Sequence, residues 1–566
     1  MTLNTPTPKT SRAMTALLVL SLLIGSHALA ADREWSGGDG SWGDTGNWAS
    51  GIAGSGDVAI FNGTDNNIDQ AITLDGTRRV QRLDFNNLGT TTFNAGTGGI
   101  LEVRPPSNPR TVVNFGVGAG AVTVNTDFSV IEESTGTRDF IFNLGDSTLN
   151  VNGQFRSTQR GQRNWEVNGG TLNLAGGMML SHDTTTTGNT RNNFFTGNGT
   201  VILGGGIDPG ANHSTLATAS GFNGILRLVN TSNDMSGSNR ITHNGGTIQF
   251  VDNVSPALGA TNELQWNGGK IAAHGGPQSV STNFNMNAGG SMEISGSEDL
   301  TLTGNLFTTD PGDMTLRVSN TALTNLEGAY LMNRSGSGSD INRNRTIEVD
   351  TGSTFRVDGN LTVSDPGSGI TLTVQGGGIL DLRNDNDYSN AGGSTTLQSG
   401  LLLANNNTGS ATGTGAVFIN GGTLGGNGFI EGDVTVNAGG TVNPGKSIGI
   451  LTLNNDATFN DDAILSIELG AGNTSDLLDI GGALNLGNDS ILNVINASFG
   501  TYTIANYGTL NGTFGSVSGL ESFEDFTLDY GSGSGDSITL TVIPEPGTLM
   551  LLGIALGALA IFRRRH

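Results

Sequence analysis

The sequence predicts an all-β protein: a right-handed parallel β-helix, or β-solenoid, with an N-terminal signal helix and a C-terminal single transmembrane helix. The 566 residues include 90 glycines and no cysteine, and only 13% are charged, so helix formers are scarce and no disulfide framework exists. Val, Ile, Leu and Thr recur in short alternating runs, which are typical of strands. A turn phrase, Asn-Gly-Gly before a short strand, recurs at intervals of about 17 to 23 residues where it clusters. That interval fits one coil of a parallel β-helix.

Stacking explains why such short units would fold. A unit of about twenty residues cannot bury its apolar face alone, whereas stacked coils pair every backbone and build one continuous core. Roughly 20 coils spaced about 4.8 Å apart would give a body on the order of 100 Å long. A series of β-sandwiches is the alternative, but it does not explain the recurring turn phrase.

The body of the chain is acidic. The sequence has 26 basic and 50 acidic residues, and the two ends, 1–30 and 543–566, contain five of the basic residues and one acid. The remainder therefore has 21 basic and 49 acidic residues, a net charge of −28. This charge disfavours nucleic acid as a partner and suits a soluble surface in an external medium.

Residues 1–30 are typical of a secretory signal peptide. Lys9 and Arg12 form the charged start, and residues 16–24 form the apolar core. The small residues Ala28 and Ala30 mark the cleavage site, so we expect the mature chain to begin near Ala31. An N-terminal membrane anchor is the alternative, but the apolar core is short for one.

Residues 31–90 are a Trp- and Gly-rich segment. Trp35, Trp42 and Trp48 lie here among glycine, serine and aspartate. We expect their rings to cover the first open end of the stacked sheet, as an N-terminal cap. The alternative is a face on which carbohydrate stacks.

Residues 91–394 are predicted to be degenerate β-helix coils. Asn and Gly tolerate positive φ, so the turn phrase bends tightly, and the strand after it alternates inward apolar with outward polar side chains. The phrase begins at Asn168, Asn244 and Asn267, and looser forms occupy 287–294 and 377–382.

Residues 395–495 contain the clearest repeats. The phrase at Ile419-Asn420-Gly421-Gly422-Thr423-Leu424 returns 17 residues later at Val436-Asn437-Ala438-Gly439-Gly440-Thr441-Val442, and Gly449-Ile450-Leu451-Thr452-Leu453 follows. About 100 residues resemble, phrase by phrase, the autotransporter-associated β-strand repeat. The resemblance implies a passenger-type β-helix. We expect four side chains here to face the core: Leu424, Val436, Ile450 and Leu453.

Residues 496–541 are predicted to be a C-terminal capping β region, with strands near 502–504, 526–529 and 537–542. Their alternating apolar residues suit a final sheet that closes the open end of the solenoid.

Residues 542–566 combine three parts in order. Pro544-Glu545-Pro546 is rigid and extended, because proline fixes φ and disfavours helix before it. Residues 547–562 carry no charge and would span roughly 24 Å as a helix. Arg563, Arg564 and Arg565 follow, and the positive-inside rule keeps them on the cytoplasmic side.

This order of parts resembles the PEP-CTERM sorting signal of exported bacterial proteins. Pro544, Glu545 and Pro546 match its namesake motif, and Arg563 to Arg565 match its basic end. The resemblance implies three interactions: with export machinery, with a membrane through the C-terminal helix, and with an exosortase-type processing enzyme. A plain C-terminal anchor helix is the alternative.

Candidate catalytic and metal-binding side chains are sparse. The six histidines are scattered without the spacing of a metal site, so we expect neither a metal site nor any other cofactor. Asp385 and Asp387 are candidates for weak calcium binding, but their run lacks the glycine and glutamate of a full calcium loop.

Arginines form two charge clusters, and we expect both on a solvent face. The first contains Arg156, Arg160, Arg163 and Glu166, and the second contains Arg343 and Arg345. Ser181-His182-Asp183 lies about one coil after Arg160 and Arg163, so this is where an active groove is conceivable.

The sequence is therefore compatible with two functions. The first is an exported, non-enzymatic protein of the cell surface or extracellular matrix, structural or adhesive, with extracellular polysaccharide as a partner and a transient membrane anchor. The alternative is a β-helix carbohydrate-active enzyme, a polysaccharide lyase or glycosidase, which needs one groove where carboxylates and an arginine converge.

Overall fold

The structure is a computed structural model of the chain. It describes residues 30–62, 68–106, 110–132, 136–158, 161–180, 191–208, 214–229, 240–253, 263–287, 291–308, 312–332, 343–363, 369–389, 392–523 and 525–543. The expected signal helix and transmembrane helix lie outside these residues, as do Ala28, Pro544, Glu545, Pro546 and Arg563 to Arg565. Within the described ranges, no helix has the length and apolar character needed to cross a membrane.

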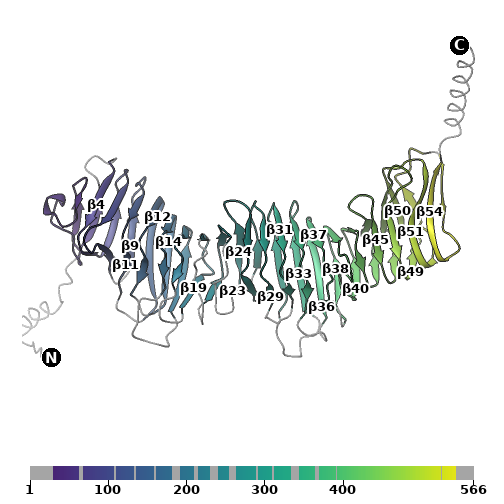
Figure 1. The fold of residues 1–566 in the computed structure, drawn as a ribbon, viewed down its shortest axis with the longest axis horizontal. Coiled ribbons are helices and arrows are strands. Elements are labelled where there is room, and N and C mark those ends of the chain that lie inside the picture. The colour runs from purple at the N-terminus through teal and green to yellow at the C-terminus, as the bar shows by residue number, and fades with distance from the viewer. Residues whose placement is uncertain are drawn as a thin grey trace, which may run out of the picture.

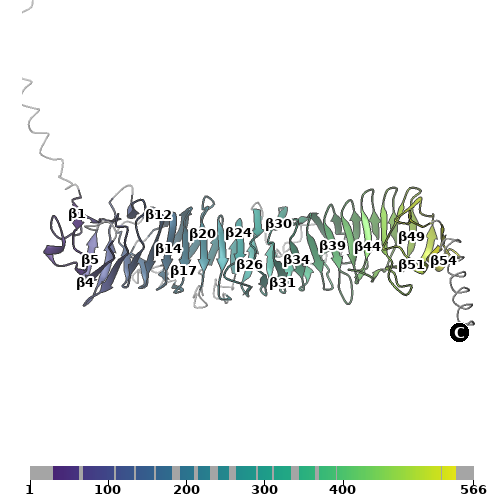
Figure 2. The same cartoon turned by 90° about the horizontal axis from the view of Figure 1, so that it is seen from above.

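The described residues wind into an elongated parallel β-solenoid, with its first and last strands at opposite ends (Figure 1). Turned by 90°, the coils are seen to stack along one long axis (Figure 2). Each coil contributes short strands to three positions, named here face 1, face 2 and face 3. Neighbouring strands on each face are parallel up to the last coil. This pairing confirms the β-solenoid and excludes a series of β-sandwiches, whose sheets are antiparallel.

Face 1 is built from strands that follow one another along the solenoid. Its members are β1 (Asp32–Trp35), β3 (Val58–Phe61), β6 (Arg82–Phe85), β9 (Thr111–Phe115), β16 (Arg191–Gly197), β19 (Ser214–Thr218), β21 (Arg240–His243), β23 (Glu263–Trp266), β26 (Asn283–Met286), β29 (Leu306–Thr308), β32 (Tyr330–Leu331), β35 (Leu361–Thr362), β42 (Phe429–Ile430), β45 (Ile450–Leu453) and β48 (Leu477–Ile480). Three long strands turn from face 1 onto face 2: β12 (Arg138–Val151), β14 (Arg163–Leu174) and β51 (Gly500–Asn511).

Face 2 runs the length of the solenoid. Besides the three long strands it contains β2 (Gly40–Ser41), β4 (Gln70–Leu74), β7 (Thr91–Ala95), β10 (Val122–Val124), β17 (Thr200–Leu203), β20 (Ile225–Leu228), β22 (Thr247–Phe250), β24 (Gly269–Ala273), β27 (Ser291–Ile294), β30 (Met314–Val318), β33 (Arg343–Val349), β36 (Ile370–Gly376), β38 (Ser394–Leu397), β40 (Ala416–Ile419), β43 (Val434–Val436), β46 (Ala457–Phe459) and β49 (Ala483–Leu486). Counted over the described ranges, 20 strands pair in succession on this face, which agrees with the expected number of coils.

In the described residues, the strands of face 3 form two separate sheets. The first sheet contains β5 (Thr77–Val80), β8 (Ile100–Val103), β11 (Phe128–Val130), β13 (Phe155–Ser157), β15 (Met178–Met179) and β18 (Ile207–Asp208). The second contains β25 (Gln278–Val280), β28 (Leu300–Leu302), β31 (Leu323–Leu326), β34 (Thr354–Val357), β37 (Ile379–Leu382), β39 (Leu401–Ala404), β41 (Thr423–Gly426), β44 (Thr441–Pro444), β47 (Ile464–Glu468), β50 (Ile491–Ile495) and β52 (Ser516–Ser518).

The core is a set of in-register stacks of inward side chains. On face 2 one stack joins eight neighbouring coils, and each member is at most 1% exposed: Leu172, Val201, Leu226, Ile248, Ile271, Ile294, Val318 and Val349. Identical spacing of strands places each apolar side chain against the next, so burial is continuous along the axis.

Three of the four predicted core residues are buried, and the fourth is not. Leu424, Val436 and Leu453 are fully buried, whereas Ile450 is 50% exposed. The prediction for Ile450 was wrong because side chains alternate along a strand. In β45, Leu451 and Leu453 therefore share the inward side, and Ile450 points outward.

The turn phrase marks corners where side-chain amides stack. Asn267 Nδ2 donates to Asn244 Oδ1 at 2.8 Å, and Asn287 Nδ2 donates to Asn267 Oδ1. Gly246, in the same phrase, has φ +70°, which a side chain would disfavour. Paired residues on successive coils are 17 positions apart at Val417 and Val434, and 31 positions apart at Thr315 and Thr346. Coil length therefore varies along the chain, which explains why the phrase is regular only in places.

The N-terminal end is filled by aromatic side chains. Trp35, Trp42 and Trp48 are at most 4% exposed, and the rings of Trp42 and Trp48 lie 5.0 Å apart at a steep angle. The 3-10 helix η1 (Thr45–Asn47) leads into Trp48. Rings buried in this way present no face on which a sugar could stack.

The C-terminal end changes from parallel to antiparallel pairing. β54 (Ser534–Ile543) runs antiparallel to both β51 and β53 (Asp525–Asp529). These strands include the three expected from the sequence. The boundaries of the segments predicted along the chain remain predictions.

Candidate functional site

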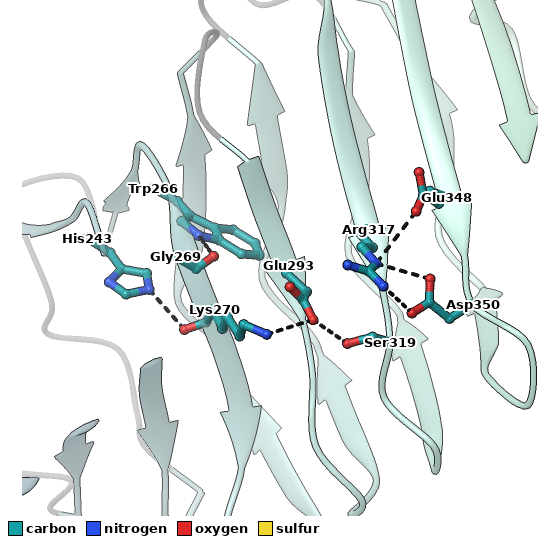
Figure 3. A network of polar contacts seen from close by, with 9 residues as sticks. All are labelled: His243, Trp266, Gly269, Lys270, Glu293, Arg317, Ser319, Glu348 and Asp350. Atoms are coloured by element: carbon teal, nitrogen blue, oxygen red, sulfur yellow. Dashed lines mark hydrogen bonds and ion pairs between the residues drawn. The ribbon is translucent and has the colours of Figure 1, made fainter. Parts of the chain in front are cut away.

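A ladder of alternating charges runs across the coils on the outer side of face 2. Lys270, Glu293, Arg317 and Glu348 occupy matching positions on four successive strands (Figure 3). Lys270 Nζ lies 3.1 Å from Glu293 Oε1, and Arg317 Nε lies 3.5 Å from Glu348 Oε1. Stacking coils thus turns single outward residues into a continuous charged row.

Asp350 completes this ladder at the turn after β33. Arg317 donates from Nε to Asp350 Oδ1 at 3.0 Å and from Nη2 to Asp350 Oδ2 at 2.6 Å. These hydrogen bonds raise the pKa of Arg317 above its usual value. Every charge of the ladder therefore has a partner of opposite sign, so the row offers no free group for a ligand.

His243 anchors the ladder from inside. Its ring is fully buried, with Nε2 2.9 Å from the carbonyl oxygen of Lys270 and Nδ1 2.9 Å from Thr218 Oγ1 (Figure 3). Burial lowers the pKa of His243 to about 4, so the ring is neutral near pH 7. The arrangement fits a structural histidine rather than a proton carrier open to solvent.

A pocket of about 420 Å³ opens on face 3, named here the face 3 pocket. Its apolar lining comes from four side chains on three strands: Ile379, Leu401, Leu403 and Pro444. Four charged side chains also line it: Arg356, Asp381, Lys446 and Glu468. The solenoid thus brings one arginine, one lysine and two carboxylates together from positions far apart in the sequence.

Asp381 is the most heavily bonded of these charges. Its Oδ1 accepts from Asn405 Nδ2 at 2.6 Å, and its Oδ2 accepts from Arg383 Nε at 3.0 Å. Lys446 Nζ lies 3.6 Å from Oδ2. The side chain of Asp381 is only 4% exposed, so its charge is neutralised within the protein.

A buried carboxylate holds the loop that carries Lys446. Asp476 is 1% exposed, and it accepts from the backbone N–H groups of Gly449 and Glu468 at 3.0 and 2.9 Å. Burial raises the pKa of Asp476 to about 6, and the neighbouring charge of Glu468 adds to this rise.

The expectation of solvent-facing arginines was wrong for Arg163 and Arg345. Both are at most 1% exposed. Arg163 Nη1 donates to the carbonyl of Leu180 at 2.7 Å, and Arg345 donates to the carbonyls of Met332 and Gly312 at 3.0 and 2.7 Å. Carbonyls at the ends of coils need donors when they are buried, and a guanidinium supplies several.

The remaining residues of the two arginine clusters differ in their surroundings. Arg156 is half-buried, and its Nη2 lies 3.4 Å from Asp127 Oδ2. Glu166 accepts from Asn168. Arg160 and Ser181-His182-Asp183 lie outside the described residues, as does the side chain of Arg343. Arg163 itself is buried in the core.

The expected calcium ligands do not converge with other acids. Asp385 Oδ1 accepts from the backbone N–H of Ser410 at 2.9 Å, and Asn386 between the two aspartates points inward. Over the described ranges, no group of three or more His, Cys, Asp or Glu side chains is placed to hold a metal ion.

Sequence reasoning missed the face 3 pocket. Arg356 and Asp381 are register partners on β34 and β37, but coil lengths vary too much for this to be read from spacing. The available signal was the charged pair Asp381 and Arg383 at the end of an otherwise apolar strand.

Comparison with known proteins adds two similarities. Residues 542–565 match the family described as the PEP-CTERM protein-sorting motif. The chain is also similar to the adhesin BmaC autotransporter of Brucella suis biovar 1 (strain 1330), with 28% identity over 488 aligned residues. That alignment covers 73% of this chain but 13% of the relative, so the chain spans only a small part of that protein's length. The chain therefore carries a PEP-CTERM protein-sorting motif behind a parallel β-solenoid body that is similar to part of an autotransporter adhesin.

Proposed function

We propose that this chain is an exported, non-enzymatic protein of the cell surface or extracellular matrix that acts by adhesion through its extended surface. The match of residues 542–565 to the sorting motif carries this proposal, since such a motif directs an exported protein. The similarity of the body to an autotransporter adhesin supports a surface role. Extracellular polysaccharide is the partner we propose for the body.

The proposed route has two processing steps. The signal peptide is removed between Ala30 and Ala31, and an exosortase-type enzyme then cuts at or near Pro544-Glu545-Pro546. Before the second cut, the apolar run in 542–566 anchors the chain as a transmembrane helix. Ala31 O accepts the N–H of Val58 at 3.0 Å, so a chain that begins at Ala31 retains its first contact between coils.

The winding of the solenoid is also proposed to be right-handed. Crossover connections between parallel strands of one sheet are right-handed in about 98% of cases, because of the twist of the strands.

Cell fractionation tests the sorting step. We would compare the native chain with a variant in which Pro544, Glu545 and Pro546 are all alanine, and with a matched control in which three exposed residues of the body are alanine. The proposal expects the native chain and the control in the surface or matrix fraction, and the motif variant retained in the membrane. Equal surface delivery of all three would contradict it.

The face 3 pocket is the observation that favours the second candidate, a carbohydrate-active enzyme, because an arginine and two carboxylates converge there. Asp381 already accepts two hydrogen bonds and an ion pair, which makes it a poor base. An assay against acidic and neutral polysaccharides decides between the two. Cleavage that is lost in Glu468→Gln would establish the enzyme and refute the non-enzymatic proposal.

A further inference from the structure

The face 3 pocket exists because one coil is short and lacks a side chain. Val417 pairs with Val434 only 17 positions on, and β41 has Gly425 where the neighbouring strands carry Leu403 and Asn443. A Cβ at Gly425 would lie 2.8 Å from Asn443 O, so only glycine fits. The backbones of Gly426 and Gly445 then bond to each other in both directions, which folds residues 445–449 back over β41.

This folded loop forms one wall of the pocket and brings in a cation. Lys446, which follows β44, reaches Asp381 on β37, three strands of face 3 towards the N-terminus, at 3.6 Å. Arg383 contacts the same carboxylate at 3.0 Å. Two cations, Lys446 and Arg383, therefore contact Asp381. Its carboxylate is occupied by them and does not pair with Arg356.

Of the two cations that line the pocket, Arg356 is the one for which the described part of the chain provides no hydrogen-bond or ion-pair partner. It is the register partner of Asp381, yet no hydrogen bond or ion pair joins the two. Its Nε is buried and makes no hydrogen bond, while the side chain as a whole is half-buried at the pocket. A buried donor without an acceptor is costly, and a guanidinium fork fits a carboxylate with two parallel hydrogen bonds.

The rest of the lining narrows the chemistry of the ligand. Glu468, Asn443 and Ser447 offer acceptors and donors suited to hydroxyl groups, and Leu401 and Leu403 offer an apolar surface. The acidic Glu468 disfavours a ligand with several negative charges. A compact ring with a single carboxylate, hydroxyl groups and a C–H face fits the limit on negative charge, the polar groups and the apolar surface of the pocket.

We propose that the face 3 pocket binds a uronate, with the ligand carboxylate on Arg356 and its hydroxyl groups on Glu468, Asn443 and Ser447. The ligand is a uronic acid, free or as a unit of an acidic polysaccharide. This inference rests on the proposed polysaccharide partner and adds the chemical class and the place of binding.

Calorimetric titration of the full chain in detergent tests the inference. The probes are D-glucuronate, an oligomer of glucuronate and neutral D-glucose. Arg356→Gln removes the cation, and Arg79→Gln is the matched control, since Arg79 is an outward arginine of face 3 far from the pocket and paired with Glu102. We expect the native chain and the control to bind glucuronate and not glucose, and R356Q to bind roughly tenfold to a hundredfold more weakly.

The outcomes distinguish free uronate from uronate in a polysaccharide, and they distinguish failure of the uronate proposal from failure of the proposed surface function. Binding of the free acid and of the oligomer with equal strength per site indicates free uronate, whereas binding of the oligomer alone indicates the polysaccharide. No binding by the native chain, equal binding of glucose, or equal affinity of R356Q and the native chain would overturn the inference. If R356Q unfolds earlier than the native chain, Lys446→Met on the loop takes its place and is expected to weaken binding, because Asp381 then competes for Arg356. Surface delivery depends on the tail, so it persists in these variants even if the pocket binds nothing.

Discussion

His243 and Lys270 are joined across neighbouring coils, with Nε2 of the buried ring donating to the backbone carbonyl of Lys270 at 2.9 Å. The side chain of Lys270 points the other way and pairs with Glu293. One residue therefore links the core to the outer charged ladder. Burial keeps the imidazole neutral, and with its proton on Nε2 its Nδ1 can accept from Thr218.

The buried histidine predicts that stability falls in mild acid. The pKa of His243 is about 4 in the folded chain and near 6.5 when unfolded, so the unfolded chain binds more protons between these values. Stability from this site is therefore complete above about pH 6.5 and is lost as the pH falls towards 4, by up to about 3 kcal/mol. Urea unfolding of the native chain and of His243→Gln at pH 7 and pH 4.5 measures this difference.

Asp476 contributes to the pH dependence of stability with the opposite sign, so its effect must be measured separately from that of His243. Its raised pKa of about 6 means that the folded chain binds more protons than the unfolded chain between about pH 4 and 6, so its contribution favours folding in acid. In the Asp476→Asn background, the loss of stability on acidification should be larger than in the native chain. If the His243→Gln variant lost as much stability on acidification as the native chain, the assignment of this loss to His243 would be wrong.

Two neighbouring residues of β45 should respond in opposite ways to the same substitution. Leu451→Asp buries an unpaired charge and is expected to cost several kcal/mol of unfolding free energy. Ile450→Asp places the charge on the outward side and should change the stability by less than about 1 kcal/mol. Thermal unfolding followed by circular dichroism compares them, and equal effects would refute the inward and outward assignment.

Substitution of a buried arginine should cost more unfolding free energy than substitution of an exposed one. Arg345→Ala removes the hydrogen bonds that Arg345 donates to the carbonyls of Met332 and Gly312, and we expect a cost of about 3 kcal/mol. Arg317→Ala removes an outward ion pair with Asp350 and should cost less than about 1 kcal/mol. Denaturant unfolding of the two variants gives both numbers. A smaller loss for R345A than for R317A would contradict the placement of Arg345.

The sequence was sufficient to predict the parallel β-solenoid and insufficient to predict the pocket. Alternation and the Asn-Gly-Gly phrase are local, so they predicted strands, corners and the burial of Leu424 and Val436. The same reasoning placed Arg163 and Arg345 outside, because it had no account of the buried carbonyls that these side chains satisfy. The approach of Lys446 to Asp381 depends on a short coil, a glycine and a folded loop acting together, and spacing alone does not reveal such a combination.

If the tail sorts an exported solenoid and is then removed, the processing is visible in the intact mass of the protein recovered from the cell surface. We predict a chain that begins near Ala31 and ends at or near Pro544-Glu545-Pro546. A surface species that retains Arg563, Arg564 and Arg565 would contradict processing and leave a plain C-terminal anchor.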